Sequence, residues 1–339
     1  MRTRNTRTTR HTVPRRPPLR RTLVGIAALT VTALVAGCGL ENANGYIAPA
    51  EPAAIEHQDS LEGVEITVGS KDFTEQLVLG NMYATILQTA GATVTNRSNI
   101  AGSVGVRNAL LNGSVDVSPE YTGTGWISYL GHDKPIKGEQ EQWQAVHDED
   151  LANGLTWLPF SPVNNTYAFA MGPDASERLG ITSLSEIKDL PVAERTFCVE
   201  DEFFSREDGF QPMLTTYGLE YGKDVPAGNV LRMDTGVVYD ATARGECNFG
   251  EVFTTDGRIL ALDLTVLEDD KGFFPLYNLA PVIQTDLVED HPEVADVFAQ
   301  LQPLLTNEVL LELNAKVDVD GGEPALVARD WLREQGLVD

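Results

Sequence analysis

The chain has 339 residues and carries 50 aspartates and glutamates against 25 lysines and arginines, which gives a formal charge of −25. So acidic a chain repels nucleic acid and anionic lipid headgroups, which argues against DNA binding and phosphate recognition. Its length exceeds that of a usual single domain, so two lobes are expected.

The first 37 residues differ in composition from the rest. Eight arginines come without any acid and are followed by the apolar run "LVGIAALTVTALVAG" and then by Cys38. A basic start and a short apolar run predict an export signal over residues 1–37, because a membrane-spanning helix needs ~20 apolar residues. "VAGC" matches the bacterial lipobox, so Cys38 is the expected lipidation site. An ordinary signal peptide with a chance cysteine is the alternative.

We therefore expect an exported protein, lipid-anchored to the outer face of the bacterial cytoplasmic membrane. Loss of the eight arginines would leave 17 basic against 50 acidic residues and a formal charge of −33. Residues 38–62 have neither helical nor strand periodicity, so they are predicted to be a flexible tether.

An alternation of strands and helices begins at residue 64. "VEITVGS", "ATVTNRS" and "SVDVS" are predicted strands, separated by the helices "TEQLVLGNMYATILQTAG" and "VGVRNALLNG". The first helix places Leu79, Met82, Ile86 and Leu87 on one face and should end at Gly91. This order predicts a parallel sheet whose ligand lies beyond the carboxyl ends of the strands, where "GSKDFTE" and "PEYTGTG" are found.

The second half repeats the pattern between two strands that leave and re-enter the first unit. "TYAFAMG" is the predicted outgoing strand and "FFPLYNLAPVI" the returning one. The prediction is an α/β protein with lobe 1 over residues 63–168 and 275–339 and lobe 2 over residues 169–274. Each lobe has a mixed, mostly parallel sheet with flanking helices, the two crossing strands form a hinge, and the ligand cleft lies between the lobes.

Two cysteines remain after the anchor, Cys198 and Cys247. A disulfide between them is plausible in an exported protein, and two buried thiols are the alternative. Cys-x-x-Cys and histidine clusters are missing from the sequence, so no metal site is expected.

The sequence does not favour an enzyme. It contains no G-x-S-x-G, H-E-x-x-H or Walker motif, and its five histidines lie in flanking or acidic segments. We expect neither catalysis nor a cofactor.

Aromatic residues stand beside turn residues at the predicted strand ends: Tyr121, Tyr167, Phe253 and Tyr277. Converging rings would suit a quaternary ammonium, at ~0.5–2 kcal/mol for each cation–π contact. The cations Lys71 and Arg206 and the hydroxyl of Thr124 lie near these rings in the sequence. A zwitterion with a trimethylammonium head and a carboxylate tail would satisfy both sets, although the sequence does not show that they converge.

A family resemblance implies that these aromatic and charged residues converge on one ligand site. "ITVGSKDFTEQLVLGNM", "LLNGSVDVSPEYTGTGW", "VNNTYAFAM", "EFFSREDGF" and "TTDGRI…LEDDKGFFPLYNLAPVI" closely resemble the substrate-binding proteins of osmoprotectant ABC importers, in matching order over residues 64–335. That family binds glycine betaine, proline betaine, choline or carnitine. The resemblance implies a two-lobed, periplasmic-binding-protein-like fold of type II that closes around its ligand.

The resemblance also assigns the site. Tyr121, Tyr167 and Tyr277 correspond to tyrosines of an aromatic cage, and Phe253 stands where the family usually has a further tyrosine. Lys71, Thr124 and Arg206 correspond to residues that hold the ligand carboxylate, and Arg206 is expected to matter most because a guanidinium grips a carboxylate through two parallel bonds.

Asn165 and Glu202 are expected behind these contacts, and Asn165 replaces an acid of some members. Lys71, which choline-preferring members often lack, favours glycine betaine as the ligand. A choline or carnitine binder, and a lipoprotein sensor without a transport role, remain alternatives. The implied partners are ABC permease subunits with a cytoplasmic ATPase and, through Cys38, the membrane. We expect a monomer.

Overall fold

The computed structural model describes residues 45–339. The predicted signal peptide, Cys38 and the first part of the predicted tether, residues 38–44, lie outside these residues. The rest of the predicted tether, residues 45–62, packs on the first lobe: Ile55 and Leu61 are buried in its core, and the backbones of Glu51 and Asp339 exchange two hydrogen bonds of 2.9 Å. The prediction of a flexible tether is therefore wrong over residues 45–62, because a segment without periodicity can still bury single apolar side chains. Within residues 45–339, no helix combines the length and the hydropathy that crossing a membrane requires.

The first lobe is built on a five-stranded sheet in the order β2-β1-β3-β10-β4. Its strands are β1 (Glu65–Lys71), β2 (Thr93–Ile100), β3 (Val117–Tyr121), β4 (Leu155–Trp157) and β10 (Leu279–Gln284). β1 is parallel to β2 and β3, whereas β10 is antiparallel to β3 and β4. The predicted crossovers through α1 (Thr74–Thr89) and α2 (Gly102–Leu111) are confirmed.

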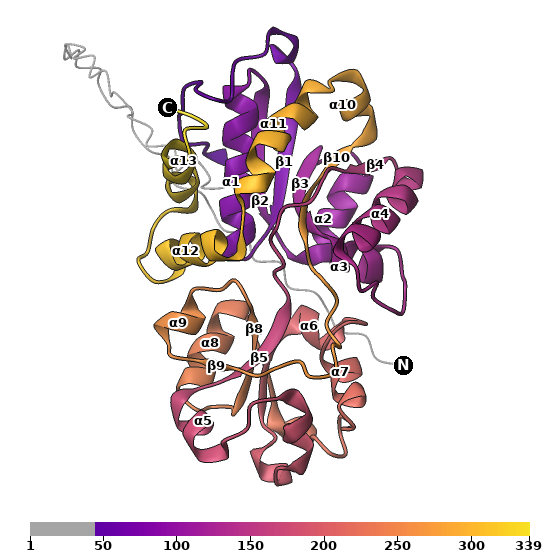
Figure 1. Cartoon of the computed structure of the whole chain (residues 1–339), viewed down its shortest axis with the longest axis vertical. Coiled ribbons are helices and arrows are strands. Elements are labelled where there is room, and N and C mark those ends of the chain that lie inside the picture. Colours follow the sequence, from indigo (N-terminus) through magenta and orange to yellow (C-terminus); the bar gives the residue numbers. More distant parts are fainter. Residues whose placement is uncertain (1–44) are drawn as a thin grey trace, which may run out of the picture. The chain divides into compact units, whose positions relative to one another are not determined.

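Helices cover both faces of this sheet (Figure 1). One face packs against α1 and against α11 (Glu293–Leu301), α12 (Asn307–Asp318) and α13 (Pro324–Glu334). The other face packs against α2 and α4 (Glu139–Asp150). The lobe also contains α3 (Thr122–Thr124), a π-helix at Gly125–Tyr129 and α10 (Thr285–Asp290).

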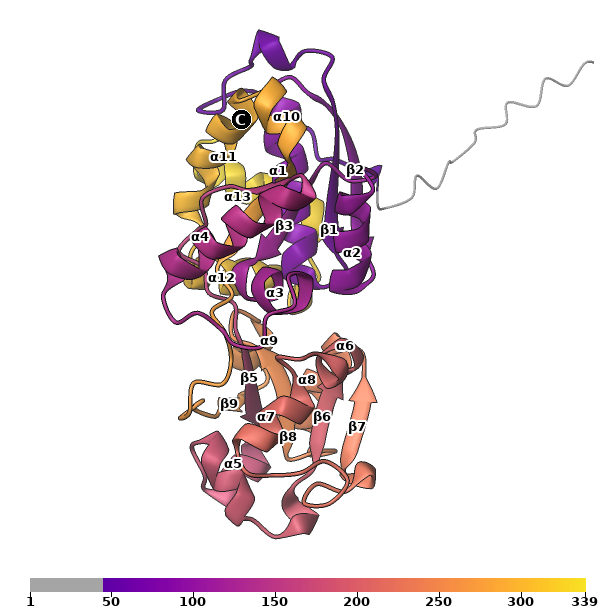
Figure 2. The ribbon, with the colours of Figure 1, turned by 90° about the vertical axis from the view of Figure 1, so that its right-hand side faces the viewer.

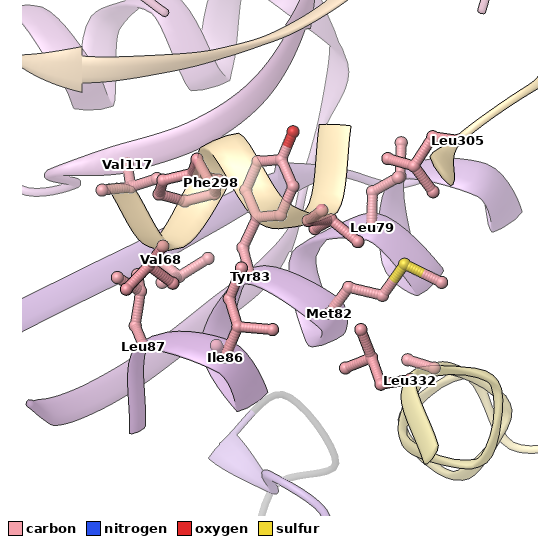
Figure 3. Packing of buried hydrophobic residues seen from close by; sticks show 14 of the residues in the cluster. Val68, Leu79, Met82, Tyr83, Ile86, Leu87, Val117, Phe298, Leu305 and Leu332 are labelled. Atoms are coloured by element: carbon pink, nitrogen blue, oxygen red, sulfur yellow. The ribbon is translucent and has the colours of Figure 1, made fainter. Parts of the chain in front are cut away.

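The core of the first lobe is centred on α1. The four residues predicted for its apolar face are all fully buried. The burial extends around nearly the whole helix, because α11, α12 and α13 pack over the side that the sheet leaves open (Figure 3). Tyr83, on that side, meets Phe298 of α11 edge-on at 4.7 Å between ring centroids. The chain then turns at Gly91, whose φ of +113° lies in the region that favours glycine.

The second lobe has its own five-stranded sheet, in the order β7-β6-β8-β5-β9. Its strands are β5 (Tyr167–Met171), β6 (Phe197–Glu200), β7 (Val230–Met233), β8 (Phe249–Phe253) and β9 (Thr265–Val266). β6 is parallel to β7 and β8, and β5 is antiparallel to β8 and β9 (Figure 2). The expected class, two lobes with mixed sheets and flanking helices, is therefore confirmed. Counted by neighbouring strand pairs, the sheets are not mostly parallel as predicted, because in each of them one strand, β10 or β5, pairs antiparallel with both of its neighbours.

Two helical layers enclose the second sheet. α5 (Pro173–Leu179), α6 (Asp201–Ser205) and α7 (Phe210–Thr216) pack in one apolar cluster with Phe169 and Phe197. α8 (Thr235–Ala243) packs in the clusters that contain Ala170 and the two cysteines, and α9 (Arg258–Ala261) follows β8.

The connections between the lobes are irregular segments rather than strands. Residues 158–166 lead into β5, and residues 267–278 lead back to β10, with one bridge between Asn164 and Asn278. β5 pairs with β8 from its first residue, Tyr167, so the division expected at residue 168 falls inside a strand of the second sheet. Strand propensity alone could not reveal this, because membership of a sheet depends on the pairing partner.

A disulfide joins Cys198 of β6 to Cys247, which lies just before β8. It links the two parallel strands whose carboxyl ends carry Glu200 and Phe253.

Reduction of this disulfide should lower the free energy of unfolding by about 4 kcal/mol, the chain-entropy estimate for a loop of this length. The bond closes a sequence separation of 49 residues. Urea denaturation of the protein with and without reductant measures the difference, and the double replacement Cys198→Ala/Cys247→Ala serves as a control that reductant should not affect. A difference below 1 kcal/mol would contradict the prediction.

Candidate functional site

A cleft of about 800 Å³ opens at the carboxyl ends of four strands. β1 ends at Lys71 and β3 at Tyr121 in the first lobe, and β6 ends at Glu200 and β8 at Phe253 in the second. All four of these residues line the cleft, together with Asn165 and Tyr277 from the connecting segments. The parallel strands place their carboxyl ends at one edge of each sheet, as the sequence predicts.

The four predicted cage residues all line this cleft. The ring of Tyr167 lies 5.4 Å from that of Tyr277 and 5.3 Å from that of Phe253, measured between centroids. Phe73, which the sequence analysis missed, continues the row: its ring lies 5.2 Å from Phe253 and 6.4 Å from Tyr121. Five rings therefore form one connected wall. Phe73 follows β1 within "GSKDF", so its position at a strand end was the available signal.

Two of the tyrosines are fixed by buried carboxylates. The hydroxyl of Tyr121 donates to Glu75 at 2.6 Å, and that of Tyr277 donates to Asp208 at 2.7 Å. Burial raises the pKa of both hydroxyls well above the ordinary value, and the neighbouring carboxylates add to the rise. Both phenols therefore stay neutral, with their rings on the cleft and their hydroxyls engaged by the protein.

The turn after β3 is tightly packed. Thr124 ends the short helix α3, is buried and lines the cleft. A Cβ atom at Gly123 would lie only 2.7 Å from the ring of Tyr277, which explains the glycine in "YTGT". The close approach brings the Tyr121 loop against the returning segment.

Lys71 is 4% exposed and lines the cleft. Its ammonium lies 2.9 Å from the carboxylate of Glu120 and 5.1 Å from the ring centroid of Tyr121. Glu120 also accepts a hydrogen bond from the hydroxyl of Tyr129 at 2.7 Å. The cation expected to meet a ligand carboxylate thus already has an acidic partner, which the sequence analysis did not identify.

Arg206 lies behind the aromatic wall. It is not among the described residues that line the cleft, and its guanidinium lies 5.6 Å from the ring centroid of Tyr167. Nε and Nη2 each donate to an oxygen of Asp208 at 2.6 Å, and Nη1 donates to Glu202 at 3.1 Å. Three of its five N–H groups are therefore engaged. Its contact with a ligand carboxylate stays a prediction.

Glu202 connects the two lobes. Its Oε2 accepts a hydrogen bond from the backbone N–H of Ser103, at the start of α2 in the first lobe, at 3.0 Å. Burial raises the pKa of Glu202, but Arg206, Lys71 and the Ser103 contacts outweigh this and hold it below the ordinary value. A carboxylate at a helix N-terminus is a favourable pairing.

The lining of the cleft is acidic. It contains Asp72, Glu200, Asp201, Glu202 and Asp234, against the two cations Lys71 and Arg258. Arg258 is paired with Asp256 and Asp318. This balance attracts cations. Among residues 45–339, no group of three or more metal-ligating side chains is placed to hold a metal ion.

Comparisons with known proteins agree with this geometry. Residues 64–334 match the family described as the substrate binding domain of ABC-type glycine betaine transport systems. The chain is 37% identical over 282 residues to a glycine-betaine-binding protein of Pseudomonas aeruginosa, which covers 81% of this chain and 89% of the relative. It is 27% identical over 279 residues to the carnitine transport binding protein OpuCC of Listeria monocytogenes, covering 81% of this chain and 88% of the relative.

Two solved structures are similar as well. Apo YehZ from Escherichia coli is 30% identical with a TM-score of 0.60, and the match covers 80% of this chain and 99% of that one. A glycine betaine/carnitine/choline ABC transporter protein is 26% identical with a TM-score of 0.65, and the match covers 80% and 98%. The chain therefore belongs to the family of substrate-binding domains of ABC-type glycine betaine transport systems.

Proposed function

We propose that this protein captures a quaternary-ammonium osmoprotectant, with glycine betaine as the preferred ligand, and delivers it to an ABC permease. The observation that carries the proposal is the single wall of five rings, from Tyr277 to Tyr121, on a cleft between two lobes. A relative named as a glycine-betaine-binding protein, at 37% identity, supports the choice of ligand.

The trimethylammonium head is held by the aromatic wall. A quaternary ammonium cannot donate hydrogen bonds, so it loses little on leaving water for ring faces, each worth ~0.5–2 kcal/mol. The acidic lining adds a favourable potential for the cation. Phe253 contributes a ring face without a hydroxyl.

The carboxylate tail is held by Lys71 and Thr124, both of which line the cleft. The Lys71 ammonium has three donors, and Glu120 accepts from one of them. Arg206 joins them when the ligand carboxylate replaces Glu202 at Nη1.

Closure of the lobes around the ligand excludes water and strengthens these contacts. The contact between Glu202 and Ser103 supports such a step, because it joins the lobes at the cleft. The closed form is recognised by the permease, whose cytoplasmic ATPase drives import. The protein acts as a monomer outside the cytoplasm, anchored to the membrane by a lipid on Cys38.

A choline-preferring site is the second candidate. It is favoured by the acidic lining and by the pairing of Lys71 and Arg206 with the protein's own carboxylates.

Calorimetric titration of the purified protein with glycine betaine and with choline tests the proposal. We expect micromolar or tighter binding of glycine betaine and at least tenfold weaker binding of choline. The reverse order would establish the second candidate. Heat from neither ligand would sink the proposed function.

A further inference from the structure

A carboxylate lies fully buried behind the aromatic wall. Glu75, the second residue of α1, is 2% exposed. Its Oε1 accepts hydrogen bonds from the hydroxyl of Tyr121 at 2.6 Å and the amide of Asn165 at 2.9 Å. Its Oε2 accepts from the hydroxyl of Thr255 at 2.5 Å and the amide of Asn314 at 3.1 Å. The four donors come from both lobes and from a connecting segment.

This arrangement suits the ionised form of Glu75. A carboxylate has about four lone-pair sites, and four donors occupy them. The orientation of the Asn314 amide is fixed, because the same nitrogen also donates to the carbonyl oxygen of Thr255 at 3.0 Å. Burial raises the pKa of Glu75 above its ordinary value, and the four hydrogen bonds oppose that rise.

Glu75 has no cationic partner within ion-pair distance among residues 45–339. The cations that line the cleft are paired elsewhere: Lys71 with Glu120, and Arg258 with Asp256 and Asp318. A buried charge without an opposite charge is costly, so the protein retains it at the expense of stability. A cation supplied by the ligand would offset that cost.

Tyr121 links Glu75 to the cleft. Its ring lines the cleft while its hydroxyl contacts Glu75, so the negative charge lies one hydrogen bond behind the ring. A charged acceptor at the hydroxyl makes the ring more electron-rich and strengthens its attraction for a cation on its face. We propose that Glu75 is the buried counter-charge of the ligand's cationic head and acts on it through Tyr121. This inference rests on the proposed function.

The test separates charge from shape. Glycine betaine and 3,3-dimethylbutanoate share a carboxylate tail, but the second has a neutral tert-butyl group in place of trimethylammonium. Replacement of Glu75→Gln, which keeps the size of the side chain, should lower the affinity for glycine betaine at least tenfold. It should change the affinity of 3,3-dimethylbutanoate, measured by competition at millimolar concentrations, less than threefold.

Two further variants control the experiment. Thr255→Val removes one hydrogen bond to Glu75 but leaves the charge of Glu75 in place. The ratio of the affinity for glycine betaine to that for 3,3-dimethylbutanoate should therefore stay within threefold of the ratio in the unmodified protein. Tyr121→Phe keeps the ring and removes the hydroxyl that contacts Glu75. The affinity for glycine betaine relative to that for 3,3-dimethylbutanoate should therefore fall at least threefold. If circular dichroism shows that Glu75→Gln does not fold, Tyr121→Phe decides, and an unchanged ratio overturns the inference.

The outcomes for the two proposals differ. If the unmodified protein binds no quaternary ammonium, both the proposed function and the inference are overturned. A second outcome is that the unmodified protein binds glycine betaine, while Glu75→Gln lowers the affinities for both ligands equally or lowers neither. In that case only the counter-charge inference is overturned, and Glu75 has a purely structural role.

Discussion

Replacement of Tyr167→Ala should weaken glycine betaine binding at least thirtyfold. The ring lies in the middle of the aromatic wall, between Phe253 and Tyr277. A desolvated cation–π contact is worth about 2 kcal/mol, which corresponds to roughly thirtyfold in affinity. The loss should exceed this, because the ring also separates the ligand cation from the guanidinium of Arg206 behind it, 5.6 Å from its centroid.

Tyr167→Phe is the matched control, measured by the same calorimetric titration. The hydroxyl of Tyr167 makes no hydrogen bond to a side chain or backbone atom within the part of the chain that the structure describes. The phenylalanine variant should therefore bind within about twofold of the unmodified protein. Equal losses in both variants, or a loss below fivefold in Tyr167→Ala, would show that the ring does not contact the cation.

Lys71→Met should lower the free energy of unfolding by about 3–5 kcal/mol, the usual cost of removing one partner of a buried ion pair. Glu120, fully buried, would lose the ammonium that lies 2.9 Å away. Urea denaturation measures this change. The double variant Lys71→Met/Glu120→Gln replaces one neutral pair by another and should recover more than half of the loss. Failure of the second replacement to recover stability would contradict this account of the pair.

The same double variant tests the carboxylate site. It keeps the net charge of the pair, so choline affinity should change less than threefold, whereas glycine betaine should bind at least tenfold more weakly. Equal changes in the affinities for the two ligands would show that Lys71 does not bind the ligand carboxylate. Thr124 and Arg206 would then be the remaining candidates for that contact.

The sequence predicted the aromatic residues at the site because strand alternation and turn residues mark where strands end. Tyr121 and Phe253 follow directly from that pattern, and the structure places both on the cleft. Two of the acids that pair with the cations could not be predicted, whereas Glu202, a partner of Arg206, was named from the family pattern. Glu120 and Asp208 are two among 50 acidic residues, and only tertiary packing shows that each is buried against a particular cation.

Arg206 illustrates the limit of a motif. Its position in "EFFSRED" matched the family pattern, but a motif carries no information on which face of Tyr167 the guanidinium occupies. Sheet membership was hidden for a similar reason. "TYAFAMG" forms the predicted strand, β5, but its pairing with β8 and β9 assigns all of it to the second lobe.

The position of β10 also bears on how the protein folds. β10 lies between β3 and β4, so Val282 pairs with Ser118, 164 residues earlier in the chain. Pairings of such long sequence separation form slowly, because the loop entropy is lost before the contacts stabilise the sheet. All strands of the second sheet come from one contiguous stretch, residues 167–266, so this sheet needs no segment from outside that range to form. The first sheet stays in two parts until the returning segment arrives, and its apolar strand edges are exposed to aggregation for that time.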